Sequence, residues 1–327
     1  MSYCSFKLPS YHQCNVATKI GVFVKLLIII NIAAGFGDGS VYDYLRMVCE
    51  DGDEHALRCT DGTTNVTKLV QDAEDFDAVV VAGGDGTVAA VTYALANTGI
   101  PVLPFPSGTA NLLANNLFSP YEPHALARMT REMETLDFDL GEIEADGKRF
   151  GFGIMAGAGY DATIMHDAQP SKKLLGPLAY FQAAVSNPTP TVSKVKIDID
   201  GKTLEREALG VLLVNFSRIQ FEIPVTHGNK PRDGAFEVVI LKSENAFGLI
   251  PALIACIRDR EGEFPDRTDS VEVHTGRNVS VYADPPLQIQ YDGELPGLTT
   301  PFKARVLDGA ARFIMSGAGY EFFTREK

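Results

Sequence analysis

Basic side chains are scarce in this sequence of 327 residues. Lys and Arg together number 29, against 42 Asp and Glu, so the formal net charge at neutral pH is −13. This excess of negative charge argues against nucleic acid as the main partner. Contact with an anionic membrane would therefore need a local basic patch or an apolar surface.

Cysteine and histidine patterns that mark disulfide frameworks or zinc sites are absent. The five cysteines, at positions 4, 14, 49, 59 and 256, are odd in number and show no C-x-x-C spacing. This usage is typical of a reduced, cytosolic protein. The six histidines form no H-E-x-x-H pattern, so a zinc site is not expected.

The apolar run at residues 20–34 is too short to cross a bilayer and contains Lys25. It also lacks the charged start and the cleavage site of a signal peptide. We interpret it as a buried first strand, from residue 25 or 26 to residue 30, preceded by a poorly ordered leader over residues 1–18. The expected protein is cytoplasmic, and any membrane contact is peripheral.

The rest of the chain is organised around residues 78–91, where four apolar residues run into Gly83-Gly84-Asp85-Gly86-Thr87. A short apolar run closed by glycines predicts a buried parallel strand. The glycines let the backbone approach a ligand. The following helix would direct its N-terminal amides at that ligand, as in phosphate sites. Asp85 among phosphates indicates Mg²⁺; the alternative is a tight turn with a capping Asp.

Strands and helices alternate around this loop. Strands are expected near residues 57–59 and 100–106, and helices over residues 42–49, 66–73 and 88–96. Such alternation predicts a parallel, doubly wound sheet. From residue 141 onward, apolar and polar residues alternate between turn signals, which predicts an antiparallel β-rich domain. We therefore expect an α/β domain over residues 19–140, completed by residues 302–316, and a β-rich domain over residues 141–301.

The loop Gly83–Thr87 resembles the nucleotide loop of the diacylglycerol kinase catalytic-domain family, which includes bacterial diacylglycerol kinases and sphingosine and ceramide kinases. NAD kinases and phosphofructokinases carry a similar loop. Residues 106–111, Pro-Ser-Gly-Thr-Ala-Asn, are similar to a second element of the lipid kinase family that the other two lack. Residues 157–162 and Asp292-Gly293-Glu294 match two further elements in the family order.

The resemblance implies roles for individual residues. Glu294 would be the catalytic base, with Asp292 and Asp85 supporting catalysis, although spacing does not separate the roles of Glu294 and Asp292. Mg²⁺ ligands would be Asp85 and Asp292, with a structural Mg²⁺ at Asp233; a plain Asp-Gly turn is the alternative at Asp233. Nucleotide contacts would come from Asn31, Gly35, Thr60, Gly83, Gly84, Asp85, Gly86, Thr87 and Thr109.

The first loop departs from the family pattern, because Ile32 replaces a proline and Gly37 stands where a basic residue is usual. The two carboxylates of the Asp292-Gly293-Glu294 turn flank a glycine, so both can face the same way. A further family-like feature is the segment of residues 172–180, with a Lys pair. A helix is also expected near residues 247–258, between the strands of the β-rich domain.

The resemblance implies an ATP- and Mg²⁺-dependent lipid kinase with an NAD kinase- and phosphofructokinase-like first domain. Diacylglycerol is the expected acceptor, and a sphingoid base or ceramide is the alternative. A non-catalytic nucleotide- or lipid-binding regulator of the same fold is the competing class. The expected partner is a lipid at a membrane surface, met transiently, and not nucleic acid; a homodimer is compatible with this interpretation.

Overall fold

The computed structural model describes residues 23–34, 39–50, 52–159, 191–216, 218–219, 223–224, 230–242 and 270–325. Gly35, the leader, residues 160–162, residues 172–180 and the helix expected near residues 247–258 lie outside this described part. The predictions made for them stay predictions.

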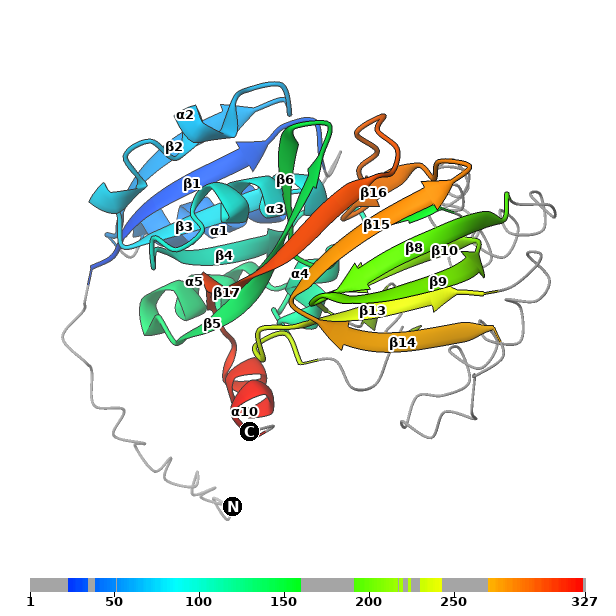
Figure 1. Cartoon of the computed structure of the whole chain (residues 1–327). Helices are drawn as coiled ribbons and strands as arrows, with labels where there is room; N and C mark the ends of the chain where they lie inside the picture. Colours follow the sequence, from blue (N-terminus) through cyan, green and yellow to red (C-terminus); the bar gives the residue numbers. More distant parts are fainter. Residues whose placement is uncertain are drawn as a thin grey trace, which may run out of the picture.

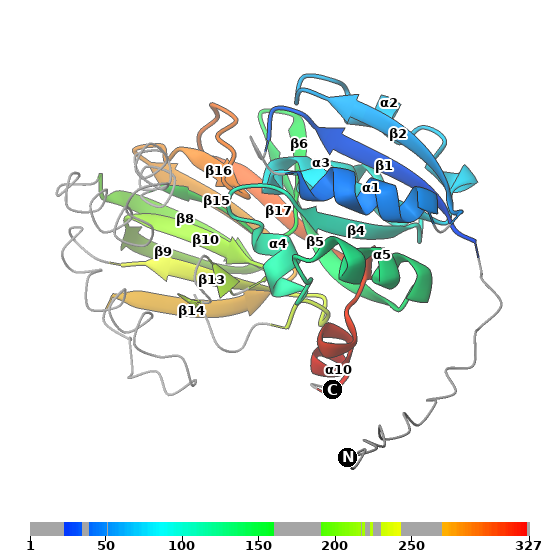
Figure 2. The same cartoon turned by 180° about the vertical axis from the view of Figure 1, so that it is seen from behind.

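The first half of the chain builds a parallel sheet. Its strands are β1 (Lys25–Asn31), β2 (Glu54–Thr60), β3 (Ala78–Gly83) and β4 (Pro101–Pro106), in the order β2-β1-β3-β4. Their side chains alternate between two cores, because successive residues of a strand point to opposite faces. Ile28 lies in the core under helices α1 (Ser40–Glu50) and α5 (Pro123–Glu132), whereas Ile29 lies in the core under α3 (Asp85–Ala94). Figure 2 shows α1 and α5 on the near face of this sheet.

Strand β17 (Phe302–Ile314) joins this sheet to the rest of the molecule. Its end pairs in parallel with β4, at Phe313 and Val102. Its beginning pairs antiparallel with β15 (Asn278–Asp284), which continues through β8 (Ser193–Ile199) to β9 (Lys202–Ala208). The long hairpin of β5 (Thr135–Ala145) and β6 (Lys148–Phe152) also pairs with β17 through β5. One sheet of ten strands therefore runs across the whole molecule (Figure 1).

A second sheet packs on the antiparallel half of the first. Its order is β14 (Val271–Gly276), β13 (Phe236–Leu241), β10 (Gly210–Val214), β7 (Met155–Gly159) and β16 (Ile289–Tyr291). The core between the two sheets is closed by aromatic residues such as Phe152 and Phe236, whose rings stack with centroids 5.4 Å apart. The predicted fold class, a parallel α/β layer followed by an antiparallel β-rich part, is confirmed.

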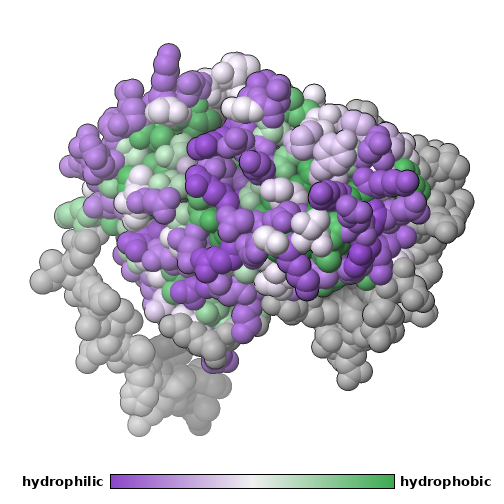
Figure 3. Space-filling view, viewed as in Figure 1, coloured by the Kyte–Doolittle hydropathy of each residue, from purple (hydrophilic) through white to green (hydrophobic). Residues whose placement is uncertain are grey.

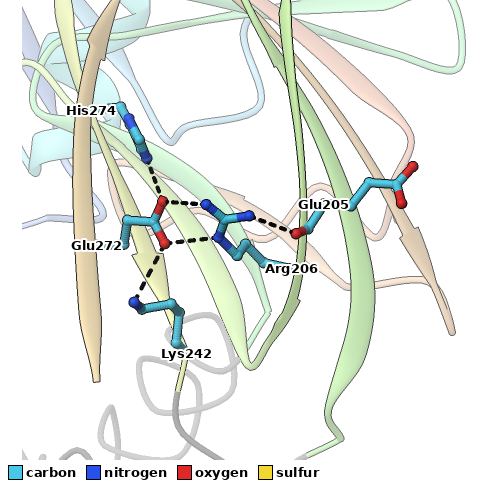
Figure 4. Close-up of polar contacts among 5 residues, drawn as sticks. All are labelled: Glu205, Arg206, Lys242, Glu272 and His274. Carbon is cyan, nitrogen blue, oxygen red and sulfur yellow. Dashed lines mark hydrogen bonds and ion pairs between the residues drawn. The ribbon is translucent and has the colours of Figure 1, made fainter. Parts of the chain in front are cut away.

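An ion cluster links the two sheets at one edge. Arg206 of β9 donates from Nε and Nη2 to the two carboxylate oxygens of Glu272 on β14, at 2.9 Å each. His274 and Lys242 contact the same carboxylate (Figure 4). The Arg206 hydrogen bonds, followed by those of His274 and Lys242, lower the pKa of Glu272 to about 2 against the cost of burial.

Four shorter elements and a terminal helix complete the described part: α2 (Val66–Leu69), α4 (Leu112–Asn116), β11 (Arg218–Ile219), β12 (Ile223–Pro224) and α10 (Gly317–Arg325). The helix expected over residues 66–73 ends early, and a 3₁₀ turn follows at Ala73–Asp75. Arg58 accounts for this difference, because its Nη1 donates to the Leu69 carbonyl at 2.6 Å and its Nη2 to Asp72 at 2.6 Å. The Ala73 N–H donates to the Val70 carbonyl at 3.1 Å, as in a 3₁₀ turn, and the Leu69 carbonyl accepts from Arg58 instead.

No helix in the described part is both long and apolar enough to span a membrane. In the view of Figure 3, hydrophilic residues cover most of the described surface, with smaller hydrophobic areas between them.

Candidate active site

The glycine loop lies where strand β3 meets helix α3. Gly84 is the N-cap of α3, with φ −75° and ψ 168°. A Cβ on Gly83 would lie 2.9 Å from Thr87 and 3.2 Å from Asn31, whereas a Cβ on Gly84 would meet no atom within 4 Å. The first glycine is therefore required by packing inside the protein. The second leaves open space in front of the helix N-terminus, where an anion is favoured.

Two polar side chains are fixed beside this loop. The Asn31 amide oxygen accepts from the backbone N–H of Ala33 at 3.0 Å, and its Nδ2 donates to Thr87 Oγ1 at 2.7 Å. Thr60 ends the neighbouring strand β2, and its buried hydroxyl accepts from the N–H of Gly62 at 3.0 Å. Because the strands are parallel, their carboxyl ends bring these groups to one edge of the sheet.

The turn Asp292-Gly293-Glu294 follows strand β16 and reaches the same edge. Asp292 and Gly293 have φ values of +43° and +87°, and the backbones of Tyr291 and Glu294 hydrogen bond to each other in both directions. The two carboxylates have different surroundings, because Asp292 is buried and Glu294 is exposed. The expectation that both face the same way stays a prediction.

Glu294 lies against the first turn of α3. A Cβ added to Gly86 would lie within 3.2 Å of Glu294 Oε1, Cδ and Cγ. The turn from the end of the chain thus delivers a carboxylate to the helix N-terminus that follows the glycine loop.

Asp292 is buried behind Glu294 and holds the turn that precedes β7. Its carboxylate accepts from the backbone N–H groups of Gly153 at 2.6 Å, Ile154 at 2.9 Å and Met155 at 2.9 Å. Burial, with a smaller contribution from the nearby charge of Asp85, raises its pKa to about 6 against these three hydrogen bonds. Asp85 in turn accepts from the N–H of Leu113 in α4 at 3.3 Å.

A cleft of about 760 Å³ opens beside these groups. It lies between the loop after β2, helix α3, strand β6 and the turn after β16. Five of the residues predicted to act in the site line it: Asn31, Thr60, Gly86, Thr87 and Glu294. Residues from both halves of the chain therefore share one cavity.

The other predicted residues that the structure describes lie outside the cleft lining. Gly83, Gly84, Asp85 and Asp292 form the loops next to it. Thr109 is exposed in the turn at residues 107–111, which packs against the glycine loop: a Cβ on Gly108 would lie 2.9 Å from Gly84 Cα.

Asp233 lies in a separate turn. Its Oδ1 accepts from the N–H of Ala235 at 3.0 Å, and the Lys230 carbonyl accepts from the N–H groups of Arg232 and Asp233. These are the hydrogen bonds of an Asp-containing turn. The structure groups no three His, Cys, Asp or Glu side chains into a metal site within the residues it describes. Mg²⁺ at Asp233 stays a prediction.

A buried carboxylate that the sequence analysis did not single out, Asp139, supports this turn. It accepts from the N–H groups of Gly234 and Gly309, both at 2.7 Å. Burial raises the pKa of Asp139 in spite of these two hydrogen bonds.

The residues that line the cleft without having been predicted include Tyr93, Arg149, Phe150 and Tyr291. The ring of Tyr93 packs on the backbone of Gly151, where a Cβ would clash with it. Its hydroxyl donates to Glu142 at 2.5 Å, and Arg305 donates to the other oxygen of Glu142 at 2.8 Å. Phe150 and Tyr291 stack with ring centroids 5.1 Å apart. In the sequence, Gly151 was the one local sign that a ring packs closely against the backbone of β6.

Two domain families match consecutive parts of the chain. The diacylglycerol kinase catalytic domain matches residues 25–143, and the YegS C-terminal NAD kinase beta sandwich-like domain matches residues 154–315. Together they account for both halves of the fold and for every segment that meets at the cleft except residues 149–151 of β6, which lie between the two matched ranges.

Individual relatives are distant. An uncharacterized protein of Synechocystis is 26% identical over 269 residues, which is 77% of this chain but only 59% of that protein. The diacylglycerol kinase of Bacillus subtilis is 29% identical over 251 residues, covering 75% of this chain and 79% of the relative. The crystal structure of a diacylglycerol kinase from Bacillus anthracis has a TM-score of 0.68 and 23% identity, covering 90% and 98% of the two chains. That structure shows a shared fold.

Proposed function

Because this chain belongs to the diacylglycerol kinase catalytic-domain family, we propose that it transfers the γ-phosphate of ATP to the hydroxyl group of a lipid. The observation that carries the proposal is the contact of Glu294 with Gly86 at the N-terminus of α3. It puts a carboxylate able to take a proton beside the place where the helix favours phosphate.

The residues present fit a nucleotide. The cleft of about 760 Å³ is in the size range of small-molecule and cofactor sites. Gly84 leaves open space before α3, and Asn31 and Thr87 are held at its edge by their mutual hydrogen bond. These groups would bind the phosphates through backbone amides, the helix dipole and neutral polar side chains.

Phosphoryl transfer needs alignment, charge neutralisation and a proton acceptor. Glu294 is exposed to the cleft and would accept the proton of the lipid hydroxyl as the new bond to phosphorus forms. Asp292 cannot face the same substrate atom in this arrangement, because its carboxylate is directed at the amides of residues 153–155. We assign it a positioning role: it fixes the turn that carries Glu294.

Asp85 is the proposed Mg²⁺ ligand. Its charge raises the pKa of Asp292, and a divalent cation relieves this kind of repulsion between neighbouring carboxylates. When bound, Mg²⁺ would neutralise charge on the phosphate oxygens during transfer.

Diacylglycerol is the lipid we propose as acceptor, with a sphingoid base or ceramide as alternatives. The lipid would be met transiently at a membrane surface by a protein acting from the cytoplasm. A non-catalytic regulator is the second candidate, favoured by the first loop, where Ile32 is 60% exposed in place of the family's proline.

A transfer assay tests the proposal. The full chain is incubated with radiolabelled ATP, Mg²⁺ and vesicles containing diacylglycerol, sphingosine or ceramide, with NAD as a soluble control. We expect label in diacylglycerol and none in NAD. Label found only in sphingosine or ceramide would show that this lipid, and not diacylglycerol, is the acceptor. ATP binding without transfer to any lipid would favour the non-catalytic regulator.

A further inference from the structure

The cleft has two chemically different halves. One half, near the start of α3, is polar and contains Asn31, Thr60 and Thr87. Farther along α3 the lining includes small or apolar side chains of two helices: Val66 and Leu69 of α2, and Ala90, Val91 and Ala94 of α3. Polar residues of the loop before α2 (Asp61, Thr63, Thr64 and Asn65) and Thr67 complete this side. A ligand with a charged end and a flat ring bearing polar edges fits such a lining.

Helix α3 fixes the order of the two halves. At a rise of 1.5 Å per residue, Ala94 lies about 14 Å along the helix axis from Asp85. A nucleotide that binds with its phosphates at Gly86 would extend its other end in this direction. Ala90 and Ala94 are one turn apart on the same face, and their methyl groups keep the α3 wall of the cleft free of bulky side chains.

Arg149 stands at this cleft from the opposite side, on strand β6. Among the described residues that line the cleft, it is the one with a positive charge. Its side chain is 57% exposed, and Nε donates to Glu144 at 2.9 Å. A guanidinium group is planar and stacks on aromatic rings. The preceding residue, Lys148, points to the other face of the strand and does not line the cleft.

Next to Arg149, Tyr93 is immobilised by its contacts with Gly151 and Glu142. Its hydroxyl is already engaged, so it contributes a fixed ring to the wall of the cleft. Arg149 and Tyr93 therefore form the end of the cleft away from the glycine loop, where neither is needed for phosphate contact.

We propose that the nucleobase of the bound nucleotide lies in the slot between Leu69 and Ala94, with the guanidinium group of Arg149 against the ring. Arg149 and the slot would then determine nucleotide specificity, whereas the glycine loop would bind any triphosphate. This inference rests on the proposed function, because it takes the phosphates to bind at the start of α3.

Calorimetry on the full chain tests it with two ligands, ATP and inorganic tripolyphosphate, each with Mg²⁺. Arg149→Ala removes the stacking group, and Ala94→Leu fills the slot from an exposed helix position without loss of helix propensity. Each is expected to raise the Kd for ATP about tenfold and to leave the Kd for tripolyphosphate unchanged. Lys148→Ala is the charge-matched control and should change neither.

Three other outcomes would overturn the inference. Unchanged ATP affinity in both variants would remove the base from this slot while leaving the proposed function intact. Equal losses for ATP and tripolyphosphate in Arg149→Ala would place Arg149 on the phosphates. A wild-type protein that binds neither ligand would overturn the proposed function, and the inference with it.

Discussion

Glu294 and Gly86 are in contact, although they belong to opposite ends of the chain. The contact requires that residue 86 have no side chain, because any Cβ there would meet the Glu294 carboxylate. It joins the turn after β16 to the helix after the glycine loop, and the proposed chemistry takes place where they meet.

Gly86→Ala should therefore displace the carboxylate without harming the fold. Residue 86 lies in the first turn of α3, where alanine is the better helix former, and Glu294 is flexible and exposed. We expect kcat for lipid phosphorylation to fall at least tenfold while the melting temperature is kept or raised. In a Glu294→Gln background the same change should have little further effect. Full additivity of the two losses would show that the contact is unimportant.

Asn31→Asp tests the phosphate end of the cleft. The substitution keeps the shape of the side chain but adds a negative charge beside the proposed phosphates, so the Kd for ATP should rise roughly tenfold. Asn97→Asp is the matched control, since Asn97 is exposed and does not line the cleft. Equal ATP affinities for both variants in calorimetry would move the phosphates away from Asn31.

Glu272→Gln tests the ion cluster that links the sheets (Figure 4). The pKa of Glu272 is lowered to about 2 in the fold, so its stabilising effect is complete above its ordinary pKa near 4.5 and is lost as the pH falls from there toward 2. Because the Arg206 side chain is 37% exposed, solvent screens the interaction. We expect a loss of about 1–2 kcal/mol in the free energy of unfolding at pH 7.

Urea unfolding at pH 7 and pH 3 measures this effect, and the difference between variant and wild type should shrink at the lower pH. Glu205→Gln is the control, because Arg206 donates to the backbone carbonyl of Glu205 and not to its side chain. A difference that grows toward low pH would contradict the assigned cause.

The parts of the fold that sequence analysis predicted are those fixed by local chemistry. The strand before the glycine loop is apolar throughout, and its glycines mark the turn, so β3 and α3 were found with small errors in their bounds. Helix α2 was overestimated because its end depends on Arg58, which comes from a neighbouring strand. The helix propensity of residues 66–73 does not depend on such a long-range contact, so it could not predict this end.

The same distinction applies to the candidate site. Asn31, Thr60 and Thr87 lie at or just after the carboxyl ends of parallel strands in one sheet, so their common location could be expected. Glu294 follows β16 of the other sheet, and its place beside them was implied by the family resemblance alone. The direction of the Asp292 side chain could not be expected from the sequence, because it depends on the left-handed backbone conformation of residues 292 and 293. Tyr93 and Arg149 were missed because the β5–β6 hairpin is placed against α3 by tertiary packing.

The most direct test of the account is the turnover of Glu294→Gln on the lipid that the wild type phosphorylates best. Glutamine keeps the shape of the side chain but cannot take up the hydroxyl proton. Removal of a general base costs about 10²–10⁴ in rate, so kcat should fall by that order while the Kd for ATP, measured by calorimetry, stays nearly unchanged. Turnover close to that of the wild type would contradict the assignment of Glu294 as the base.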